Sequence, residues 1–141
     1  MTGTPELMKI LLVEDSLADV ELTLDALQDA KVANEVTVVR DGAAALAHLR
    51  SGDVPSPDLV ILDLNLPRLS GHEVLAVMKA DDALRRIPVA VLSTSAAESD
   101  VAKTYDLGAN CFLTKPVDID QFVHVVQSID DFWLGLVRLP Q

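Results

Sequence analysis

The sequence predicts an α/β fold of the flavodoxin-like type, a (βα)5 doubly wound parallel sheet with the strand order 2-1-3-4-5. Three observations lead to this prediction. Short apolar runs alternate with amphipathic helical patterns five times along the chain. The run at 59–62 is apolar throughout, as expected for a strand buried on both faces of a parallel sheet. The chain has 141 residues, half of them hydrophobic, which is enough for one core.

The first strand–helix unit begins with an apolar run at 8–13, which two acidic residues follow. Ser16 or Asp15 is expected to cap the next helix, because a short polar side chain there accepts a hydrogen bond from a free backbone N–H group. Apolar residues at spacings of three and four predict the buried face of this helix: Leu17, Val20, Leu24 and Leu27.

The second unit and the third strand follow the same plan. β-branched residues predict a strand at 35–39, and a short Ala-rich helix starts at Asp41. Gly and Pro residues mark the segment 51–58 as a loop. The third strand then ends on Asp63, which places a carboxylate at the edge of the sheet where open parallel sheets bind ligands.

Capping boxes predict the starts of the next two helices, at Ser70 with Glu73 and at Ser95 with Glu98. The apolar run at 88–92 between them predicts the fourth strand.

The last unit has a strand at 110–114 and a helix opened by Asp118. Cys111, the single cysteine, lies in an apolar run and is expected to be a buried small hydrophobe. The final helix carries a wide apolar stripe: Ile119, Phe122, Val125, Val126, Ile129, Phe132 and Trp133.

Composition limits the possible partners. The chain has 11 Lys and Arg against 22 Asp and Glu, a net charge of -11. Such a surface repels phosphate backbones and anionic lipid, so we expect no direct nucleic-acid or membrane binding. Residues 1–7 are too few and too polar for a signal peptide, and no apolar run approaches the roughly 20 residues needed to span a bilayer. We expect a cytoplasmic protein with one domain over 1–141, its core at about 7–130 and a C-terminal helix and tail at 131–141.

The strand order decides which polar residues meet. The direction of winding reverses between strands 1 and 3, so their carboxyl ends bring together Glu14, Asp15 and Asp63. Three nearby carboxylates repel one another and either hold a proton or bind a cation, and an oxygen ligand set favours Mg²⁺. Ser93 and Lys115 follow the neighbouring strands at the same edge. This set of groups suits phosphoryl transfer to Asp63.

These motifs, in this order, resemble the receiver domain of bacterial two-component response regulators (CheY-like). The matching residues are Glu14, Asp15, Asp63, Leu66, Pro67, Gly71, Ser93, Lys115 and Pro116. The resemblance implies that Asp63 is the phosphoacceptor, that Asp15 binds Mg²⁺ directly and that Glu14 binds it through water or a neighbouring group. It further implies that the backbone carbonyl of Asn65 completes the metal site and that Lys115 pairs with the phosphoryl group.

The resemblance also implies a switch. Ser93 matches the hydroxyl that contacts the phosphoryl group, although a shift of one residue in the strand would put Thr94 there. Phe112 matches the aromatic residue whose rotamer is coupled to that hydroxyl, or it is simply part of the core.

A narrower resemblance is carried by residues 13–20, 92–95 and 131–140. They are similar to stand-alone regulators paired with bacterial and cyanobacterial phytochrome histidine kinases. This implies a phytochrome-type histidine kinase as partner and a homodimer formed through the face of helix 4, strand 5 and helix 5.

The favoured function is therefore a single-domain response regulator, a phosphoacceptor signalling module and not an enzyme with turnover. A phosphorylation-independent pseudo-receiver scaffold and a chemotaxis-type regulator are the alternatives. A metal-dependent phosphatase would need a second acid two residues after its nucleophile, where Asn65 stands.

Overall fold

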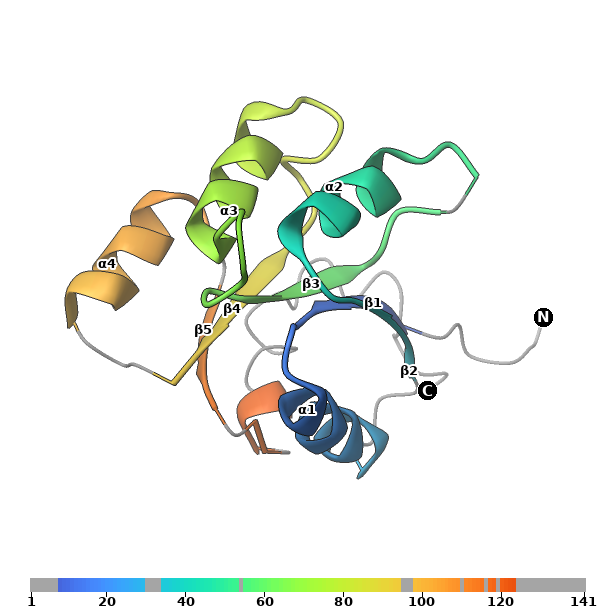
Figure 1. Ribbon diagram of the computed structural model, residues 1–141, viewed down its shortest axis with the longest axis vertical. Coiled ribbons are helices and arrows are strands. Elements are labelled where there is room, and N and C mark those ends of the chain that lie inside the picture. Colours follow the sequence, from blue (N-terminus) through green and yellow to red (C-terminus); the bar gives the residue numbers. More distant parts are fainter. Residues whose placement is uncertain are drawn as a thin grey trace, which may run out of the picture.

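The computed structural model describes residues 8–29, 34–53, 55–94, 98–109, 111–115, 117–118 and 120–123. The helices and strands are, in chain order, β1 (Met8–Val13), α1 (Leu17–Asp29), β2 (Asn34–Val39), α2 (Gly42–Arg50), β3 (Leu59–Asp63), α3 (Gly71–Ala80), β4 (Val89–Ser93), α4 (Glu98–Asp106) and β5 (Cys111–Thr114). The strands form one parallel sheet in the order β2-β1-β3-β4-β5 (Figure 1), which confirms the predicted fold class.

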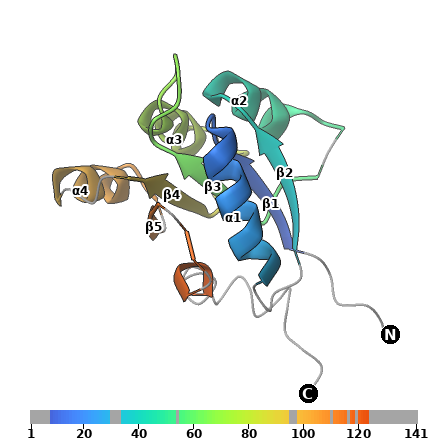
Figure 2. The ribbon, with the colours of Figure 1, turned by 60° about the horizontal axis from the view of Figure 1, so that its bottom comes forward.

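Helices cover both faces of the sheet, with α2 and α3 on one side and α1 on the other (Figures 1 and 2). Alternate side chains of each strand therefore enter different cores. The core on the α1 side includes Ile10, Leu12, Val20, Leu27, Ile61, Leu92 and Phe122. The core on the α2 and α3 side includes Leu11, Leu46, Leu49, Val60, Leu62, Val74, Met78 and Val91. Every residue of β3 is buried, as its unbroken apolar run predicts.

Caps start the helices where the sequence indicates. Ser16 is the capping residue of α1, since its Oγ accepts a hydrogen bond from the backbone N–H of Asp19 at 3.3 Å. The capping box of α3 is complete, and both of its hydrogen bonds join Ser70 and Glu73. After α4, Gly108 has a φ of 102°, a left-handed conformation that glycine adopts without strain and that commonly ends a helix.

Val20 and Leu27 are buried and Leu24 packs against the core, as predicted for the first helix. One residue of that predicted face, Leu17, and two strand boundaries are wrong. The side chain of Leu17 is 64% exposed, and Thr23 and Ala26 are buried on α1 instead. A helix that returns antiparallel to β1 begins at the carboxyl edge of the sheet, so its first residue has no strand beneath it. The second strand starts one residue earlier than predicted, at Asn34, and the fourth runs over Val89–Ser93 without its proline.

Several predictions concern parts of the chain outside the described residues: the capping residue Ser95, the C-terminal tail at 131–141 and most of the apolar stripe of the last helix. Of that helix, residues 120–123 are described, and the backbone N–H of Gln121 donates to Asp118 as predicted. Cys111 is buried, as expected. Within the described part of the chain, no helix has the length and apolar character required to cross a bilayer.

Candidate functional site

One lysine side chain lies among three carboxylates at the carboxyl edge of the sheet. The Nζ atom of Lys115 is 2.8 Å from Glu14 Oε1, 2.9 Å from Asp19 Oδ2 and 3.2 Å from Asp63 Oδ2. Glu14 follows β1, Asp19 lies in the first turn of α1, and Asp63 ends β3. Because parallel strands end at the same edge, residues far apart in the sequence meet here, as predicted for Glu14, Asp63 and Lys115.

Lys115 is positioned by its own backbone. It is the first residue after β5, and its N–H donates to the carbonyl of Ser93, the last residue of β4, at 2.9 Å. The side chain of Lys115 is only 9% exposed. Its long side chain can therefore extend past the end of β4 and reach the carboxylate at the end of β3.

Asp63 is buried, and both of its carboxylate oxygens have partners. Oδ1 accepts a hydrogen bond from the backbone N–H of Asn65 at 3.0 Å, and Oδ2 accepts one from Lys115. The first residue of α3, Gly71, lies against the backbone of Asp63 and Leu64 and donates its N–H to the Leu64 carbonyl at 3.2 Å. A Cβ atom at position 71 would collide with the Asp63 carbonyl, so a glycine is needed for α3 to start this close to the site.

The residues predicted to act as a switch lie on β4 and β5. Ser93 is buried at the end of β4, and the next residue, Thr94, is exposed. Phe112 lies opposite Val91 in the sheet and is half-buried against the core on the α2 and α3 side. Both arrangements are compatible with the predicted roles of Ser93 and Phe112.

Two predicted metal ligands lie at the rim of the site. Asp15 is exposed, and its backbone carbonyl accepts a hydrogen bond from the guanidinium of Arg40 at 2.7 Å. Asn65 is exposed as well. Among the described residues no three His, Cys, Asp or Glu side chains are arranged around a common metal position. In the structure the carboxylates of Glu14 and Asp63 converge on Lys115 instead.

Asp19 is the member of the cluster that sequence reasoning missed. One feature of the sequence could have predicted its position. The helix that follows β1 begins at the edge where β1 and β3 end, so an acidic residue in its first turn lies beside the site. The pattern of apolar residues on that helix gave no reason to single it out.

The cluster carries surplus negative charge. Three ionised carboxylates around one ammonium group leave a net charge of about minus two. Burial, together with a hydrogen bond to Asp63, raises the pKa of Glu14 above its ordinary value. Burial alone would lower the pKa of Lys115, but its contacts with Glu14 and Asp19 and the charge of Asp63 outweigh burial and raise it. A hard divalent cation prefers carboxylate oxygens, and one bound beside the cluster would neutralise its surplus charge.

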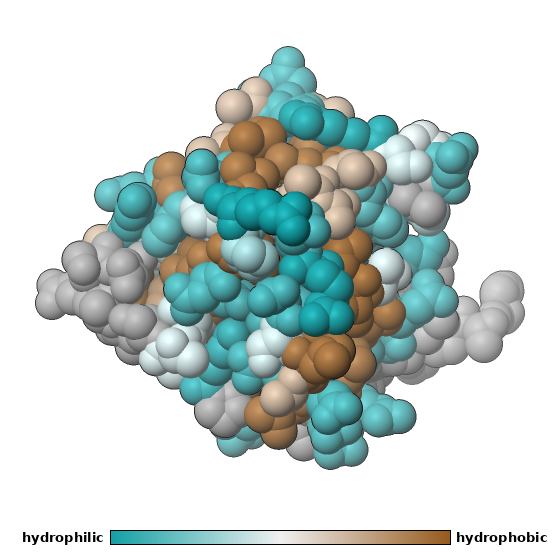
Figure 3. All heavy atoms as spheres, viewed as in Figure 1, coloured by the Kyte–Doolittle hydropathy of each residue, from teal (hydrophilic) through white to brown (hydrophobic). Residues whose placement is uncertain are grey.

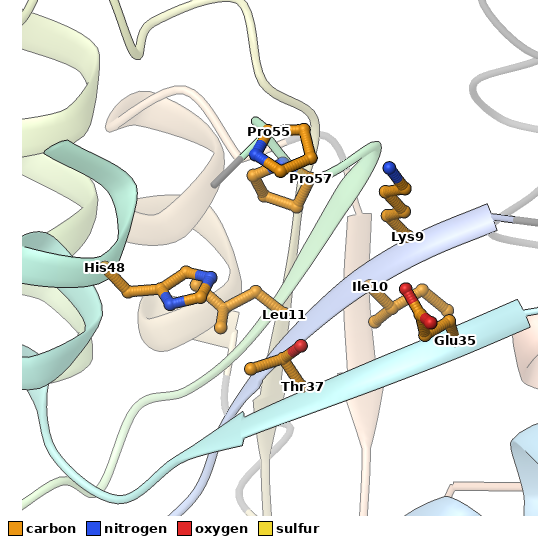
Figure 4. A pocket seen from close by; sticks show the side chains of 8 residues that line it. All are labelled: Lys9, Ile10, Leu11, Glu35, Thr37, His48, Pro55 and Pro57. Carbon is orange, nitrogen blue, oxygen red and sulfur yellow. The ribbon is translucent and has the colours of Figure 1, made fainter. Parts of the chain in front are cut away.

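A separate hollow of about 250 Å³ lies between α2, the two strands β1 and β2 and the loop before β3 (Figure 4). Its lining residues are Lys9, Ile10, Leu11, Glu35, Thr37, His48, Pro55 and Pro57. None of them belongs to the cluster of Glu14, Asp19, Asp63 and Lys115.

The surface in Figure 3 is largely hydrophilic, with apolar patches between the polar side chains.

The chain is similar to known proteins over most of its length. The response regulator receiver domain family matches residues 10–127. The response regulator Rcp1 of Synechocystis sp. is 46% identical over 135 residues, which are 93% of this chain and 92% of Rcp1.

Three solved structures resemble the fold over nearly the whole chain. The bacteriophytochrome response regulator AtBRR superposes with a TM-score of 0.81 at 44% identity and covers 97% of this chain and 99% of its own. The phosphorylated cyanobacterial phytochrome response regulator RcpA has a TM-score of 0.75 at 46% identity, with coverages of 96% and 100%. The Mn²⁺-bound form of Rcp1 has a TM-score of 0.73 at 47% identity, with coverages of 95% and 99%.

Proposed function

The chain belongs to the response regulator receiver domain family, and we propose that it is a stand-alone regulator that accepts a phosphoryl group on Asp63 from a histidine kinase. One observation carries the assignment to Asp63: this carboxylate is buried at the carboxyl end of the central strand and contacts a buried lysine at 3.2 Å. A buried carboxylate beside a fixed cation is placed to attack phosphorus while the charge that develops on the phosphoryl oxygens is neutralised.

The chemistry assigned to the chain's own residues is simple. A carboxylate oxygen of Asp63 forms a bond to phosphorus as the bond between phosphorus and the donor nitrogen breaks, which leaves an acyl phosphate on the regulator. Lys115 remains an ammonium ion throughout and contacts the transferred group. The backbone N–H of Asn65, which donates to Asp63 Oδ1 at 3.0 Å, helps to hold the carboxylate in place.

We propose that the divalent cation bound at the site is Mg²⁺. Asp15, Asp63 and the backbone carbonyl of Asn65 would hold it, with Glu14 acting through water. The surplus charge of the cluster supports this assignment, and the relative Rcp1 has been solved with Mn²⁺. When bound, the cation neutralises charge on the phosphoryl oxygens. In the structure, Glu14, Asp19 and Asp63 share the ammonium group of Lys115.

Phosphorylation then acts as a switch. A phosphoryl group adds a charge of about -1.5 to -2 and three acceptor oxygens. Ser93 supplies the hydroxyl that moves toward this group, and Phe112, half-buried at the neighbouring strand, occupies the space that the hydroxyl leaves. The surface of α4, β5 and the last helix changes with it and alters partner affinity, because the modification shifts an equilibrium between two arrangements.

The kinase partner is of the phytochrome type. AtBRR is a bacteriophytochrome response regulator and RcpA a cyanobacterial phytochrome response regulator, and both match almost the whole chain. We place both partners in the cytoplasm and assign the whole of 1–141 to one receiver domain. We further propose that two copies associate through the face of α4, β5 and the last helix, and that the net charge of -11 keeps the chain from direct nucleic-acid contact.

The test is mass spectrometry of the native protein after incubation with acetyl phosphate and Mg²⁺. We expect one added phosphoryl group on the wild-type chain and on Asp53→Asn, a control that removes an exposed carboxylate outside the cluster. We expect no addition on Asp63→Asn or in the presence of EDTA. An equal addition on Asp63→Asn, or no addition on the wild-type chain, would refute the proposal.

A further inference from the structure

The ammonium group of Lys115 is shared by more carboxylates than phosphoryl transfer requires. It has three N–H donors, and three carboxylates lie around it. Asp19 Oδ2 is 2.9 Å from Nζ, closer than Asp63 Oδ2 at 3.2 Å. The lysine that is expected to contact the phosphoryl group is therefore already engaged by a residue outside the predicted site.

The first turn of α1 holds Asp19 in this position. The backbone N–H of Asp19 donates to Ser16 Oγ, and the backbone N–H of Ser16 donates to Glu14 Oε2 at 3.0 Å. These two bonds link the end of β1 to the cap of the helix that carries Asp19. The helix cap thus positions the backbone from which the side chain of Asp19 reaches Lys115.

The three carboxylates differ in their access to water. The side chain of Asp19 is 31% exposed, whereas those of Glu14 and Asp63 are 1% and 3% exposed. A buried carboxylate that loses its partner costs the full desolvation penalty, but a partly exposed one can be hydrated instead. When new oxygens compete for Lys115, Asp19 is consequently the partner that is released at the lowest cost.

We propose that Asp19 is a positioning residue that restrains Lys115 in the unphosphorylated protein, so that a phosphoryl group on Asp63 must displace Asp19 to gain the full contact of the lysine. The inference rests on the function proposed above. It makes Asp19 a residue that favours the unphosphorylated state and sets how readily the phosphorylated arrangement forms, although Asp19 itself takes no part in bond formation.

The test uses beryllofluoride, an anion that mimics a phosphoryl group on Asp63, at saturating Mg²⁺. In Asp19→Asn we expect the beryllofluoride concentration that gives half-saturation to fall about two- to fivefold, as expected from the loss of one partly exposed ion pair. Asp25→Asn removes an exposed carboxylate from the same helix and is expected to behave like the wild-type chain. Asp19→Glu restores the charge and should return the value toward that of the wild-type chain.

A spectroscopic measurement separates restraint of Lys115 from a general effect of charge. The Nζ signal of Lys115, assigned by its loss in Lys115→Arg, is followed by NMR. We expect Asp19→Asn to shift this signal before beryllofluoride is added, and Asp25→Asn to leave it in place. Equal half-saturation in Asp19→Asn and the wild-type chain, an equal fall in Asp25→Asn, or an unmoved Lys115 signal in Asp19→Asn would overturn the inference.

The two proposals fail differently. If the wild-type chain binds no beryllofluoride in the presence of Mg²⁺, the proposed function fails, and the inference about Asp19 fails with it. If the wild-type chain binds beryllofluoride normally and Asp19→Asn matches it, the inference about Asp19 fails alone.

Discussion

At the scale of single residues, the site is built from charges that are unfavourable without a partner. Glu14 is 1% exposed, accepts a hydrogen bond from the backbone of Ser16 and contacts Lys115 through its other oxygen. Burial and the neighbouring Asp63 raise its pKa. Burial makes the ionised form of Glu14 unfavourable, and a bound cation would stabilise that form. The free energy that this burial costs the folded protein therefore also contributes to its affinity for a cation.

The raised pKa of Glu14 predicts how stability depends on pH. Its folded-state pKa lies above the unfolded value of about 4.5, so the folded protein binds more protons between these two values. In EDTA, the free energy of unfolding should therefore fall as pH rises from the unfolded pKa through the folded pKa, and then level off. Glu14→Gln should lose this contribution, whereas Glu21→Gln, an exposed site on α1, should keep it.

Urea titrations of the three proteins between pH 4 and pH 8, the range in which carboxyl and histidine groups titrate, measure this difference. Curves for Glu14→Gln and the wild-type chain that run parallel across the whole range would contradict it.

At the scale of elements, α3 and β3 are joined closely at Asp63. The helix starts at Gly71, whose backbone lies on that of Asp63 and Leu64. In the connecting loop Arg68 has a φ of 64°, a conformation that costs a non-glycine residue about 1 kcal/mol or more. The short connection therefore brings the helix close to the carboxylate through two special backbone positions, one of them occupied by glycine and one by arginine.

Substitution of Gly71 tests this close approach. In Gly71→Ala the new Cβ meets backbone atoms of Asp63 and Leu64, which cannot rotate away as a side chain would. Overpacking costs about 1–3 kcal/mol, and the better helix propensity of alanine returns up to about 1 kcal/mol. We expect a net loss of about 1–2 kcal/mol in the free energy of unfolding, and slower phosphorylation by acetyl phosphate.

Gly52→Ala is the matched control, because nothing lies within 4 Å of its Cβ position. It should change stability by no more than about 0.5 kcal/mol and leave phosphorylation unchanged. Equal stability and equal phosphorylation rates in the two variants would show that α3 can shift without disturbing Asp63.

At the scale of the whole molecule, the parallel sheet separates two cores and leaves its carboxyl edge for the charged cluster. α4 lies at the β5 end of the sheet (Figure 1), on the face proposed for association. Among the described residues of α4 and the last helix, the large apolar side chains of Tyr105 and Val123 are 48% and 37% exposed. Exposed apolar side chains are ordinary when single, but here they lie on elements that the proposed switch would move.

The proposed association face predicts that a substitution within it changes the mass of the protein in solution. We expect light scattering to give the mass of two chains for the wild-type protein in the presence of beryllofluoride and Mg²⁺. Tyr105→Glu should give the 15.2 kDa of one chain, because burying a carboxylate without a partner in the interface is unfavourable. Leu22→Glu, on the exposed side of α1, is the control and should remain dimeric. A dimeric Tyr105→Glu would place the interface elsewhere.

Much of the site follows from where strands end. Asp63 was predicted because an apolar run stops on it, and Glu14 and Lys115 because each follows a strand that ends at the same edge. Leu17 shows the limit of prediction from helical spacing. Its spacing matches a buried face, but the first residue of α1 has no strand beneath it and is exposed. Asp19 was missed for the opposite reason. Nothing in the helical pattern distinguishes it from other surface acids, and its contact with Lys115 depends on where α1 lies relative to the sheet.

The sequence by itself determined the order of the elements, the caps and therefore which strand ends, with which carboxylates, meet at one edge. These depend on local periodicity and on the handedness of strand–helix connections, which short-range sequence patterns encode. Only the tertiary structure decided that Lys115 binds three carboxylates, that Asp19 is one of them and that α3 begins against Asp63. These contacts depend on how helices pack on the sheet to within about an ångström, and that is set by the complementary shapes of side chains far apart in the sequence.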